Sequence, residues 1–484
     1  MNNHVGKDVY KNNVSNTLSF SLVFFMSTIL LTSTIVSAVL PSNLFSSISN
    51  SYDTDIVQMA YAVADTQIDI KEDGDQDIDE CDDDVCENSL SSIFNTANSG
   101  SGSLLQNVKS DYEQKNEKCN DNDGNSEGDC VNEIENNDIL ENTGLGDLTQ
   151  KVKSNQEQKN KECTDNDENE FGCVNLSEAE LVVENDGAGD TKQKIENDGE
   201  QKNRQCVDND RNGAGCINFS ITGSFLDNQG TGDIKQSTKN IAEQKNQKCH
   251  ENNENGYDGC SNYFITEYAT DNFGFGDAKQ STKNKAGQEN TGCERSDGNV
   301  NGTCFNIFFD QGNITNTGIG SLEQNTQNKA GQENIECERN DSNVEGCVNQ
   351  VVGVTLADNE GAGDIKQSTK NKVEQENIEC ERNDSNELGC ANLIFGIGLA
   401  DNEGAGDIKQ STKNKVEQEN IECVKNGGLP FGCLNNVENE VVSENSINYN
   451  LNLNVDRNFE QENIECKNNS PCENNIASII HMKQ

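Results

Sequence analysis

The chain contains no tryptophan, only three prolines and only three histidines among its 484 residues. Apolar residues make up 31% of it, and many of them precede position 41. So little apolar side chain is typical of disorder, because too little surface is buried to offset the entropy of the chain. Basic residues are also scarce, with 36 against 85 acids and a net charge of −49. Such a polyanion repels phosphate, which argues against nucleic acid as a partner.

The scarcity of histidine also bears on catalysis and on metal binding. His4, His250 and His481 form no Ser/His/Asp or Cys/His constellation with recognisable spacing. We therefore expect no enzyme and no cofactor. Zinc sites need Cys-x2-Cys spacing with a second pair or histidines, and this chain offers neither. The twenty cysteines need another explanation.

The N-terminal segment indicates export. Lys7 and Lys11 precede Leu18–Leu40, a stretch of 23 residues without a charge. This pattern predicts a signal peptide or a single membrane anchor, with the remainder of the chain outside. Residues 1–38 form this segment if cleavage follows Val36-Ser37-Ala38; if it is retained, the membrane is contacted only through Leu18–Leu40. We expect an extracellular or cell-surface protein whose cysteines are oxidised.

The cysteines define a repeat. They fall in ten close pairs: Cys81-Cys86, Cys119-Cys130, Cys163-Cys173, Cys206-Cys216, Cys249-Cys260, Cys293-Cys304, Cys337-Cys347, Cys380-Cys390, Cys423-Cys433 and Cys466-Cys472. From the second cysteine of each pair to the first of the next, the interval is always 33 positions, while the length inside a pair varies. A fixed frame beside variable loops indicates a repeat array over residues 81–472. An acidic linker, 39–80, precedes the array, and a tail, 473–484, follows it.

Polar residues recur at fixed positions of this frame, counted here from the second cysteine of each pair as position 0. Asn stands at positions 2, 12 and 30, Gln at 20 and 28, and Gly at 14 and 16, in eight or nine of the nine copies. The stretch LADNEGAGDIKQSTKNKVEQENIEC even occurs twice unchanged, at Leu356–Cys380 and Leu399–Cys423. All these positions are even, and even positions share one face of a strand. The segment has too few aliphatic residues for an amphipathic helix.

The face that carries the amides excludes charge and must point inward. Buried amides are stable only when they are paired, and stacked coils pair each Asn or Gln with its copy above and below. The sequence therefore predicts an all-β fold, a repeat β-solenoid of about nine 43–44-residue coils, each with a disulfide-closed loop. Closing the eleven-residue ring of Cys423 and Cys433 stabilises the fold by roughly 2.5–3 kcal/mol.

Within each coil we expect about three short strands. The Asn-x-Gly-x-Gly-Asp segment predicts a corner, because Gly and Asn adopt left-handed or bulged backbone. A further bend is expected near Asn414. The ninth frame lacks the glycines and instead alternates Asn with larger side chains from Ile447 to Val455, which predicts a terminal strand that closes the stack.

Two resemblances follow from these motifs. The Gln410-x3-Asn414-x3-Gln418 spacing, with Asn240-x-Ala242-x-Gln244 and Asn284-x-Ala286-x-Gln288, resembles curlin, the β-solenoid subunit of bacterial curli fibres. It covers about a third of each repeat, and curlin has a shorter repeat and no cysteine. The composition is also similar to that of exported Asn- and Cys-rich surface repeat proteins of archaea.

Carboxylates provide candidate calcium ligands, since calcium prefers oxygen. Position 17 is Asp in six copies: Asp147, Asp190, Asp233, Asp277, Asp364 and Asp407. The acidic segment carries Asp73, Asp75, Asp77 and Asp79 with the alternate spacing of an EF-hand loop, but Ile78 stands where that loop needs Gly. A solvated acidic surface is the alternative interpretation.

Glycosylation sequons complete the candidate sites. They lie at Asn175, Asn218, Asn301, Asn313, Asn340, Asn383 and Asn468. From all these observations we expect an exported structural or adhesive repeat protein of the cell surface or extracellular matrix. The alternative is a calcium- or glycan-binding surface module. The expected partners are further copies of the chain or cell-surface polymers.

Overall fold

The structure is a computed structural model. It describes residues 52–59, 66–78, 81–82, 86–120, 130–164, 171–208, 214–252, 259–295, 299, 302–339, 345–381, 388–403, 405–424, 431–445, 450–466 and 472–483. The expected signal peptide or anchor and Asp79 lie outside these ranges. The regular elements in these ranges are strands, and none of the described residues forms a helix that would be long and apolar enough to span a membrane.

The strands form three sheets. Sheet A contains, in spatial order, β1 (Tyr52–Met59), β4 (Cys86–Asn98), β7 (Cys130–Asn142), β10 (Phe171–Asn185), β13 (Ala214–Asn228), β15 (Cys260–Asn272), β17 (Gly302–Asn316), β19 (Glu345–Asn359), β21 (Leu388–Asn402), β23 (Phe431–Asn445) and β25 (Cys472–Lys483). Sheet B contains β2 (Thr66–Ile78), β5 (Leu104–Asn116), β8 (Leu148–Asn160), β11 (Thr191–Arg204), β14 (Ile234–Gln247), β16 (Ala278–Thr291), β18 (Leu322–Ile335), β20 (Ile365–Asn377), β22 (Ile408–Asn420) and β24 (Leu451–Asn463). Sheet C contains β12 (Cys206–Val207), β9 (Cys163–Thr164), β6 (Cys119–Asn120) and β3 (Cys81–Asp82).

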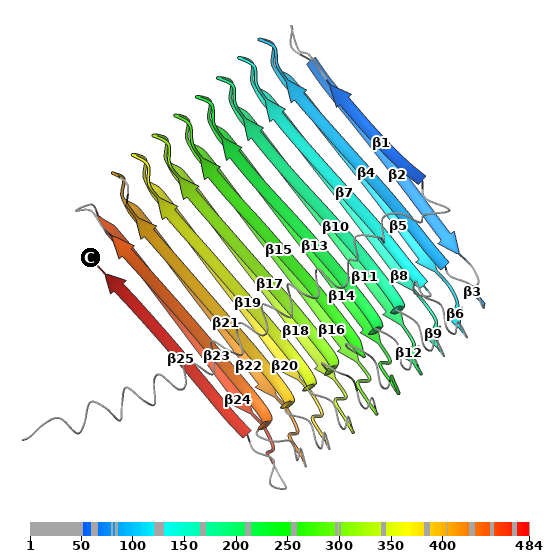
Figure 1. The fold of residues 1–484 in the computed structure, drawn as a ribbon. Coiled ribbons are helices and arrows are strands. Elements are labelled where there is room, and N and C mark those ends of the chain that lie inside the picture. The colour runs from blue at the N-terminus through cyan, green and yellow to red at the C-terminus, as the bar shows by residue number, and fades with distance from the viewer. Residues whose placement is uncertain are drawn as a thin grey trace, which may run out of the picture. The chain divides into compact units, whose positions relative to one another are not determined.

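Each coil contributes one strand to sheet A and the next strand to sheet B, so the chain winds as a flattened β-solenoid (Figure 1). Neighbouring strands are parallel and pair equal frame positions; Gln367 lies opposite Gln410, and Asn371 opposite Asn414. The expected β-solenoid repeat is confirmed. Because the frame is constant, the different loop lengths between the cysteines do not disturb this register.

The expected division of the coil into short strands is wrong. β22 runs from Ile408 to Asn420 without a break, so there is no bend at Asn414. In the described frames between Cys86 and Cys423, each coil has two long strands, and a two-residue strand or a single bridge follows at the first cysteine of the next pair. The long strands persist because their even residues pack against the opposite sheet along the whole length. No Gly or Pro in β22 supplies a turn.

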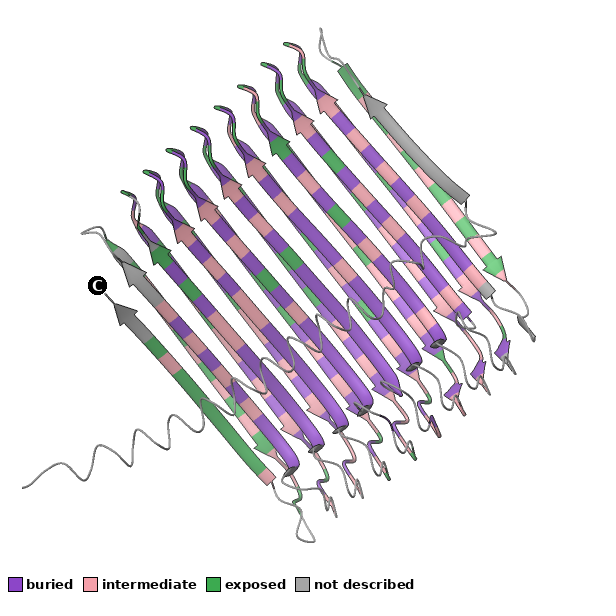
Figure 2. Cartoon of the chain, viewed as in Figure 1, coloured by how far each residue is buried: buried purple, intermediate pink, exposed green. Residues whose placement is uncertain are grey.

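The even positions face inward, as expected. Buried and more exposed residues alternate along the strands (Figure 2), and in β22 the even residues Gln410, Gln418 and Asn420 are buried. Apolar columns run between the amides. One column holds the cysteines, another joins positions 4 and 26, and a third joins positions 10 and 18. Polar and apolar side chains therefore form layers that repeat in every coil.

The glycine corner is confirmed, but its physical reason differs from the expected one. A Cβ built on Gly363 would lie 1.9 Å from the carbonyl oxygen of Gly320 in the previous coil. Glycine is needed there because successive coils approach closely, whereas its φ is not left-handed. Positive φ instead occurs just before the first cysteine of a pair, for example at Glu379 and Glu422.

The sheets extend beyond the expected limits of the array. β2 lies in the segment expected to be an acidic linker, and it pairs with β5. β25 lies mostly in the expected tail and pairs with β23. Hydrogen bonding to an open sheet edge can order these polar segments even though their composition predicts a linker. β24 is the last strand of sheet B, and Leu453 and Val455 face inward there.

Candidate functional site

The repeated site of this protein is the interior amide column at the cysteine end of the coils. The Asn at position 2 of sheet A and the Asn at position 30 of sheet B are both buried. Asn218 Nδ2 donates to Asn262 Oδ1 of the next coil at 2.8 Å and to Asn246 Oδ1 across the solenoid at 3.1 Å. Asn246 Nδ2 donates to Asn290 Oδ1 at 3.0 Å. Each Asn therefore links two coils and also links the two sheets.

These bonds continue along the stack. The position 2 ladder joins Asn88, Asn132, Asn175, Asn218, Asn262, Asn306, Asn349, Asn392, Asn435 and Asn474. The position 30 ladder joins Asn116, Asn160, Asn203, Asn246, Asn290, Asn334, Asn377, Asn420 and Asn463. The ladders expected from the sequence are thus present from coil to coil.

Glutamine ladders run beside them with the opposite polarity. Gln244 Nε2 donates to Gln201 Oε1 of the previous coil at 2.8 Å and to the Tyr263 carbonyl oxygen at 2.8 Å. Asparagine amides at positions 2 and 30 donate toward the C-terminal end of the stack, whereas glutamine amides at positions 20 and 28 donate toward the N-terminal end. Adjacent ladders therefore carry opposed dipoles, and every ladder has a donor end and an acceptor end.

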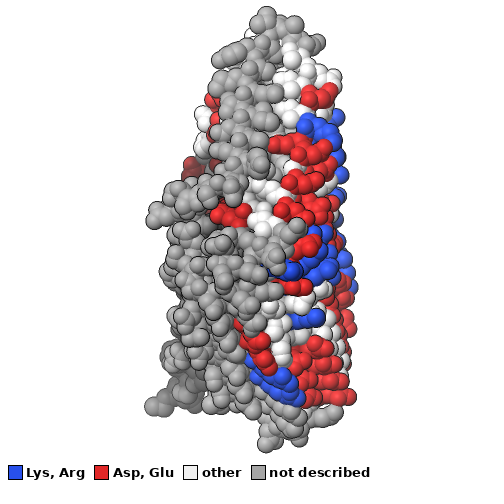
Figure 3. Space-filling model, turned by 90° about the vertical axis from the view of Figure 1, so that its right-hand side faces the viewer, with Lys and Arg blue, Asp and Glu red and all other residues white. Residues whose placement is uncertain are grey.

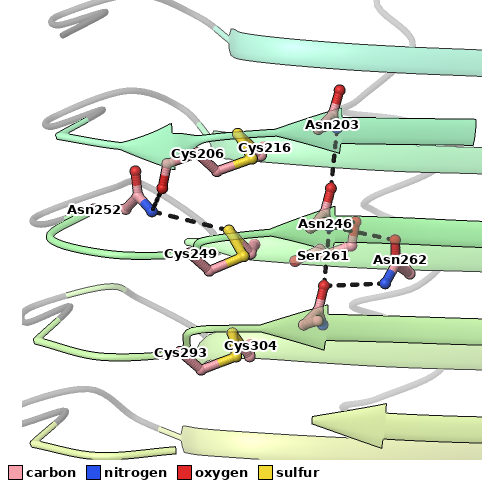
Figure 4. The surroundings of a disulfide bond; sticks show 12 residues. Asn203, Cys206, Cys216, Asn246, Cys249, Asn252, Ser261, Asn262, Cys293 and Cys304 are labelled. Carbon is pink, nitrogen blue, oxygen red and sulfur yellow. Dashed lines mark hydrogen bonds between the residues drawn. A yellow bond between two sulfur atoms is a disulfide. The ribbon is translucent and has the colours of Figure 1, made fainter. Parts of the chain in front are cut away.

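Disulfides close the coils at this same end. Among the described side chains nine disulfides are formed, each within a pair: Cys119–Cys130, Cys163–Cys173, Cys206–Cys216, Cys249–Cys260, Cys293–Cys304, Cys337–Cys347, Cys380–Cys390, Cys423–Cys433 and Cys466–Cys472. The side chains of Cys81 and Cys86 lie outside the described part. Figure 4 shows three stacked pairs beside the asparagine ladder, where Asn252 Nδ2 donates to the Cys206 carbonyl oxygen at 2.8 Å. So many disulfides indicate an oxidising, extracellular environment.

The aspartates at position 17 line the glycine corner. The Asp147 carboxylate accepts the backbone N–H of Asp190 at 3.0 Å, and the Asp364 carboxylate accepts that of Asp407 at 2.9 Å. The same bond joins Asp190 to Asp233 and Asp233 to Asp277. These carboxylates therefore tie one coil to the next, and each retains further lone pairs toward solvent.

The acidic stretch expected to resemble an EF-hand loop is an extended strand. Asp73, Asp75 and Asp77 lie on β2 with exposed side chains on its outer face. Asp73 pairs with Lys71, and Lys115 Nζ lies 3.4 Å from Asp77 Oδ2. These acids and the corner aspartates lie far apart along the strands, so the structure does not bring the two candidate groups together.

A third row of carboxylates was not anticipated from the sequence. Position 29 of sheet B is Lys in the early coils, as at Lys245, but Glu in the later ones: Glu289, Glu333, Glu376, Glu419 and Glu462. These glutamates line a shallow groove that the absent side chains of Gly287 and Gly331 widen. Partial burial and then the neighbouring carboxylates raise the pKa of Glu333 and Glu376, although Lys245 lowers that of Glu333.

Figure 3 shows acidic and basic side chains gathered in adjoining clusters on one side of the molecule. The change from Lys to Glu at position 29 is visible when the frames are aligned, so the sequence did contain the signal for this row. The spacing of residues within a single frame cannot show this row, because the row is formed by one position compared across successive coils.

The sequons fall into three groups. Asn175 and Asn218 are fully buried rungs of the position 2 ladder, so they offer no accessible amide for a glycan. Asn301, Asn340, Asn383 and Asn468 lie outside the described residues, and Asn313 lies on the outer face of β17.

No protein-family model matches the chain, and no curated protein or solved structure matches it either.

Proposed function

We propose that this chain is an exported structural or adhesive repeat protein of the cell surface or extracellular matrix. The observation that carries the proposal is the continuity of the buried amide ladders from the first described coils to the last. Such ladders add hydrogen bonds along the stacking axis wherever a coil is added. A stack that is bonded in this way and closed by disulfides suits a load-bearing or displaying role outside the cell.

The test is the location of the protein on cells. Antibodies against the purified protein should label the surface or the surrounding matrix of intact, unpermeabilised cells. A protease added outside should remove that label. A cytosolic protein should be labelled only after permeabilisation. Label that appears only then would contradict the proposal.

A second candidate is calcium binding, which the row of glutamates at position 29 favours. Carboxylates one coil apart lie about 4.8 Å from each other in a parallel sheet, so two of them can share one hard cation. Calcium should then raise the thermal midpoint of the wild-type protein and raise it less in Glu376→Gln. Glu267→Gln, an exposed change on the other sheet, serves as the matched control. Equal calcium shifts in both variants would reject this site.

A further inference from the structure

The outer face of sheet B concentrates basic residues in an otherwise acidic chain. Odd positions of this sheet point outward, and in β14, β16, β18, β20 and β22 positions 19, 23 and 25 hold twelve of the 36 basic residues. All twelve are lysines: three each in β16, β20 and β22, two in β14, and Lys329 in β18. We call them the lysine face. Position 21, which lies among them, is Ser or Asn in these strands.

The lysine face stays positive when the neighbouring acids are counted. Glu323 is the one acid at these positions of the five strands, and it lowers the charge from +12 to +11. Position 27 of the same strands adds Glu243, Glu374 and Glu417, while the other two strands have glycine there. These three acids lower the charge to +8, in a chain whose net charge is −49. Positive charge is therefore segregated onto this part of the surface.

The lysines are stacked in columns that cross the strands. At position 25, four successive strands place Lys285, Lys329, Lys372 and Lys415 opposite one another. Like charges directly opposite each other destabilise a sheet. The fold does not require lysine at this position, because β11 has Asp198 there. A column of like charges that the fold does not need indicates a role in binding something outside the chain.

Half of the lysine face has exposed side chains that form no ion pair with the described residues: Lys235, Lys239, Lys283, Lys329, Lys370 and Lys409. The other lysines are paired with acids on the surface. The Nζ atoms of Lys279 and Lys366, for example, lie 2.7 Å and 2.8 Å from the Glu323 carboxylate oxygens. Exposed ion pairs of this kind contribute little to stability. A bound polyanion can therefore contact the unpaired ammonium groups and compete for the paired ones.

The spacing of the columns suits a linear polymer. Neighbouring strands lie about 4.8 Å apart, so the position 25 column repeats its ammonium groups at that interval, and the five strands span about 19 Å. Positions 19 and 25 lie about 20 Å apart along a strand. A compact ligand would contact only a few of these lysines. A polymer of uronic acids carries one carboxylate on each sugar ring, and a ring is about as long as the strand spacing.

We propose that the lysine face binds a linear polysaccharide of uronic acids, with the polymer lying along the lysine columns and its carboxylates paired with the ammonium groups. Duplex nucleic acid fits less well, because most phosphates around its circumference cannot reach a flat face but are still repelled by the acids of the chain. The inference names the partner of the adhesive role proposed above and rests on that role. Binding is measured on purified protein and location on cells, so a failure of one is distinguished from a failure of the other.

The net charge of the chain determines how this binding depends on salt. At about 0.01 M salt, charges act over about 30 Å, which exceeds the width of the lysine face, so the net charge of −49 repels the polymer. At about 0.1 M the range is about 10 Å, and a polymer on the face experiences mainly the lysines. At about 1 M the range is about 3 Å, and the lysines are screened as well. Binding should therefore be tightest near the middle of this series.

Removing charge from the lysine face tests the proposal. The triple variant Lys283→Gln, Lys329→Gln and Lys370→Gln removes three unpaired ammonium groups, and Gln327 at position 23 indicates that glutamine is tolerated on this face. Calorimetric titration with polygalacturonate in the presence of a chelator, so that no calcium links the polymer to the acids, should show about tenfold weaker binding at about 0.1 M salt.

A control variant removes the same number of charges from position 29 of the early strands, where each lysine is paired with an acid two residues away: Lys115→Gln, Lys159→Gln and Lys202→Gln. It has the same net charge as the test variant and should bind polygalacturonate like the wild type. Uncharged dextran should not bind to any of the three proteins. Thermal midpoints of both variants establish that they are folded.

Three results would overturn the proposal. The first is a wild-type protein that does not bind polygalacturonate at any salt concentration. The second is an equal affinity of the test and control variants, since net charge and not the lysine face would then govern binding. The third is tighter binding of a duplex oligonucleotide than of polygalacturonate, which would assign the lysine face to another class of polymer.

Discussion

At the scale of single residues, the central feature is the buried asparagine that bonds in three directions. Asn246 donates to Asn290 Oδ1 in the next coil at 3.0 Å and to the Ser261 carbonyl oxygen at 3.0 Å. It also accepts from Asn203 and Asn218. No other side chain of this size offers both a donor and an acceptor in a planar group, so the residue type is fixed by its two neighbours in the column.

Replacing one buried asparagine of an interior ladder should therefore lower the stability of the fold strongly. Asn246→Ala removes one buried acceptor from each of the Asn203 and Asn218 amides, which keep only their bonds to neighbours such as the Ile217 carbonyl oxygen and Asn262 Oδ1. It also removes the donor to Asn290, and together these losses should lower the free energy of unfolding by about 3–5 kcal/mol. Asn463→Ala removes a rung at the half-exposed edge strand β24, where water replaces the lost bonds, and should cost less than half as much. Chemical denaturation compares the two variants. Equal losses would contradict the view that these amides act through burial.

Buried carboxylates should make the stability depend on pH. Burial raises the pKa of Asp138 to about 7 and that of Asp310 to about 6, and four hydrogen-bond donors partly offset the effect at Asp310. Between about pH 4 and 7 the folded state binds more protons than the unfolded state. The contribution of these two aspartates to stability is therefore full below about pH 4 and is lost as the pH rises to about 7.

Asp138→Asn tests this assignment, because the Oδ1 atom of Asp138 is buried without a partner. The variant should be more stable than the wild type at pH 8, by about 2–4 kcal/mol, and its unfolding free energy should change less between pH 4 and 7. Denaturation at several pH values measures both effects. The exposed acid Glu180 gives a control in Glu180→Gln, which should follow the wild-type pH profile.

At the scale of elements, the glycine corner depends on the close approach of successive coils. Gly363→Ala places a methyl group against the Gly320 carbonyl oxygen and should destabilise the fold by about 2–4 kcal/mol. Gly331→Ala is the matched control, because a Cβ there meets nothing within 4 Å. The control lies in β18 and should be neutral or slightly stabilising. A similar thermal midpoint for both variants would refute the packing explanation of the corner.

The strand register gives a second prediction at this scale. Deleting Lys415 from β22 shifts the residues that follow by one, exposes Val416 and brings Lys413 or Glu417 to the inner face. Deleting one residue between Cys293 and Cys304 only reduces the cysteine separation from 11 to 10, the value found for Cys337 and Cys347. The first deletion should lower the thermal midpoint strongly and the second weakly. Equal midpoints would contradict the assignment of faces.

The sequence predicted the frame, the inner face and the ladders because an in-register parallel stack keeps the same residue at the same height. The parity of Gln410 and Gln418 alone was enough to assign their face. It could not predict the unbroken length of β22, because strand length here depends on packing against the opposite sheet. The bonds between Asn218 and Asn246 were also missed, since positions 2 and 30 meet only when the coil flattens.

At the scale of the whole molecule, the sequence predicted repetition better than it predicted the ends. The composition of β2 reads as an acidic linker, and its role as an edge strand is visible only from its pairing with β5.

Whole coils should be removable. Deleting residues 391–433 takes out one 43-residue unit and joins Cys390 to Leu434, which preserves every frame position and every column. The shortened chain should fold with the same circular dichroism per residue and a slightly lower midpoint, because it loses one nearest-neighbour interface. A deletion of 42 residues over the same region, which breaks the frame, is the control and should unfold at a much lower temperature.

The identity of residues 356–380 and 399–423 has a genetic consequence. Two unchanged copies at a step of 43 residues offer long matching tracts to recombination, and an unequal exchange between them gains or loses a whole coil. Each such event changes the height of the stack by about 4.8 Å and leaves both terminal strands intact. Descendant genes can therefore differ in length by multiples of one coil, and the length of the solenoid can change without any change in the frame or in its register.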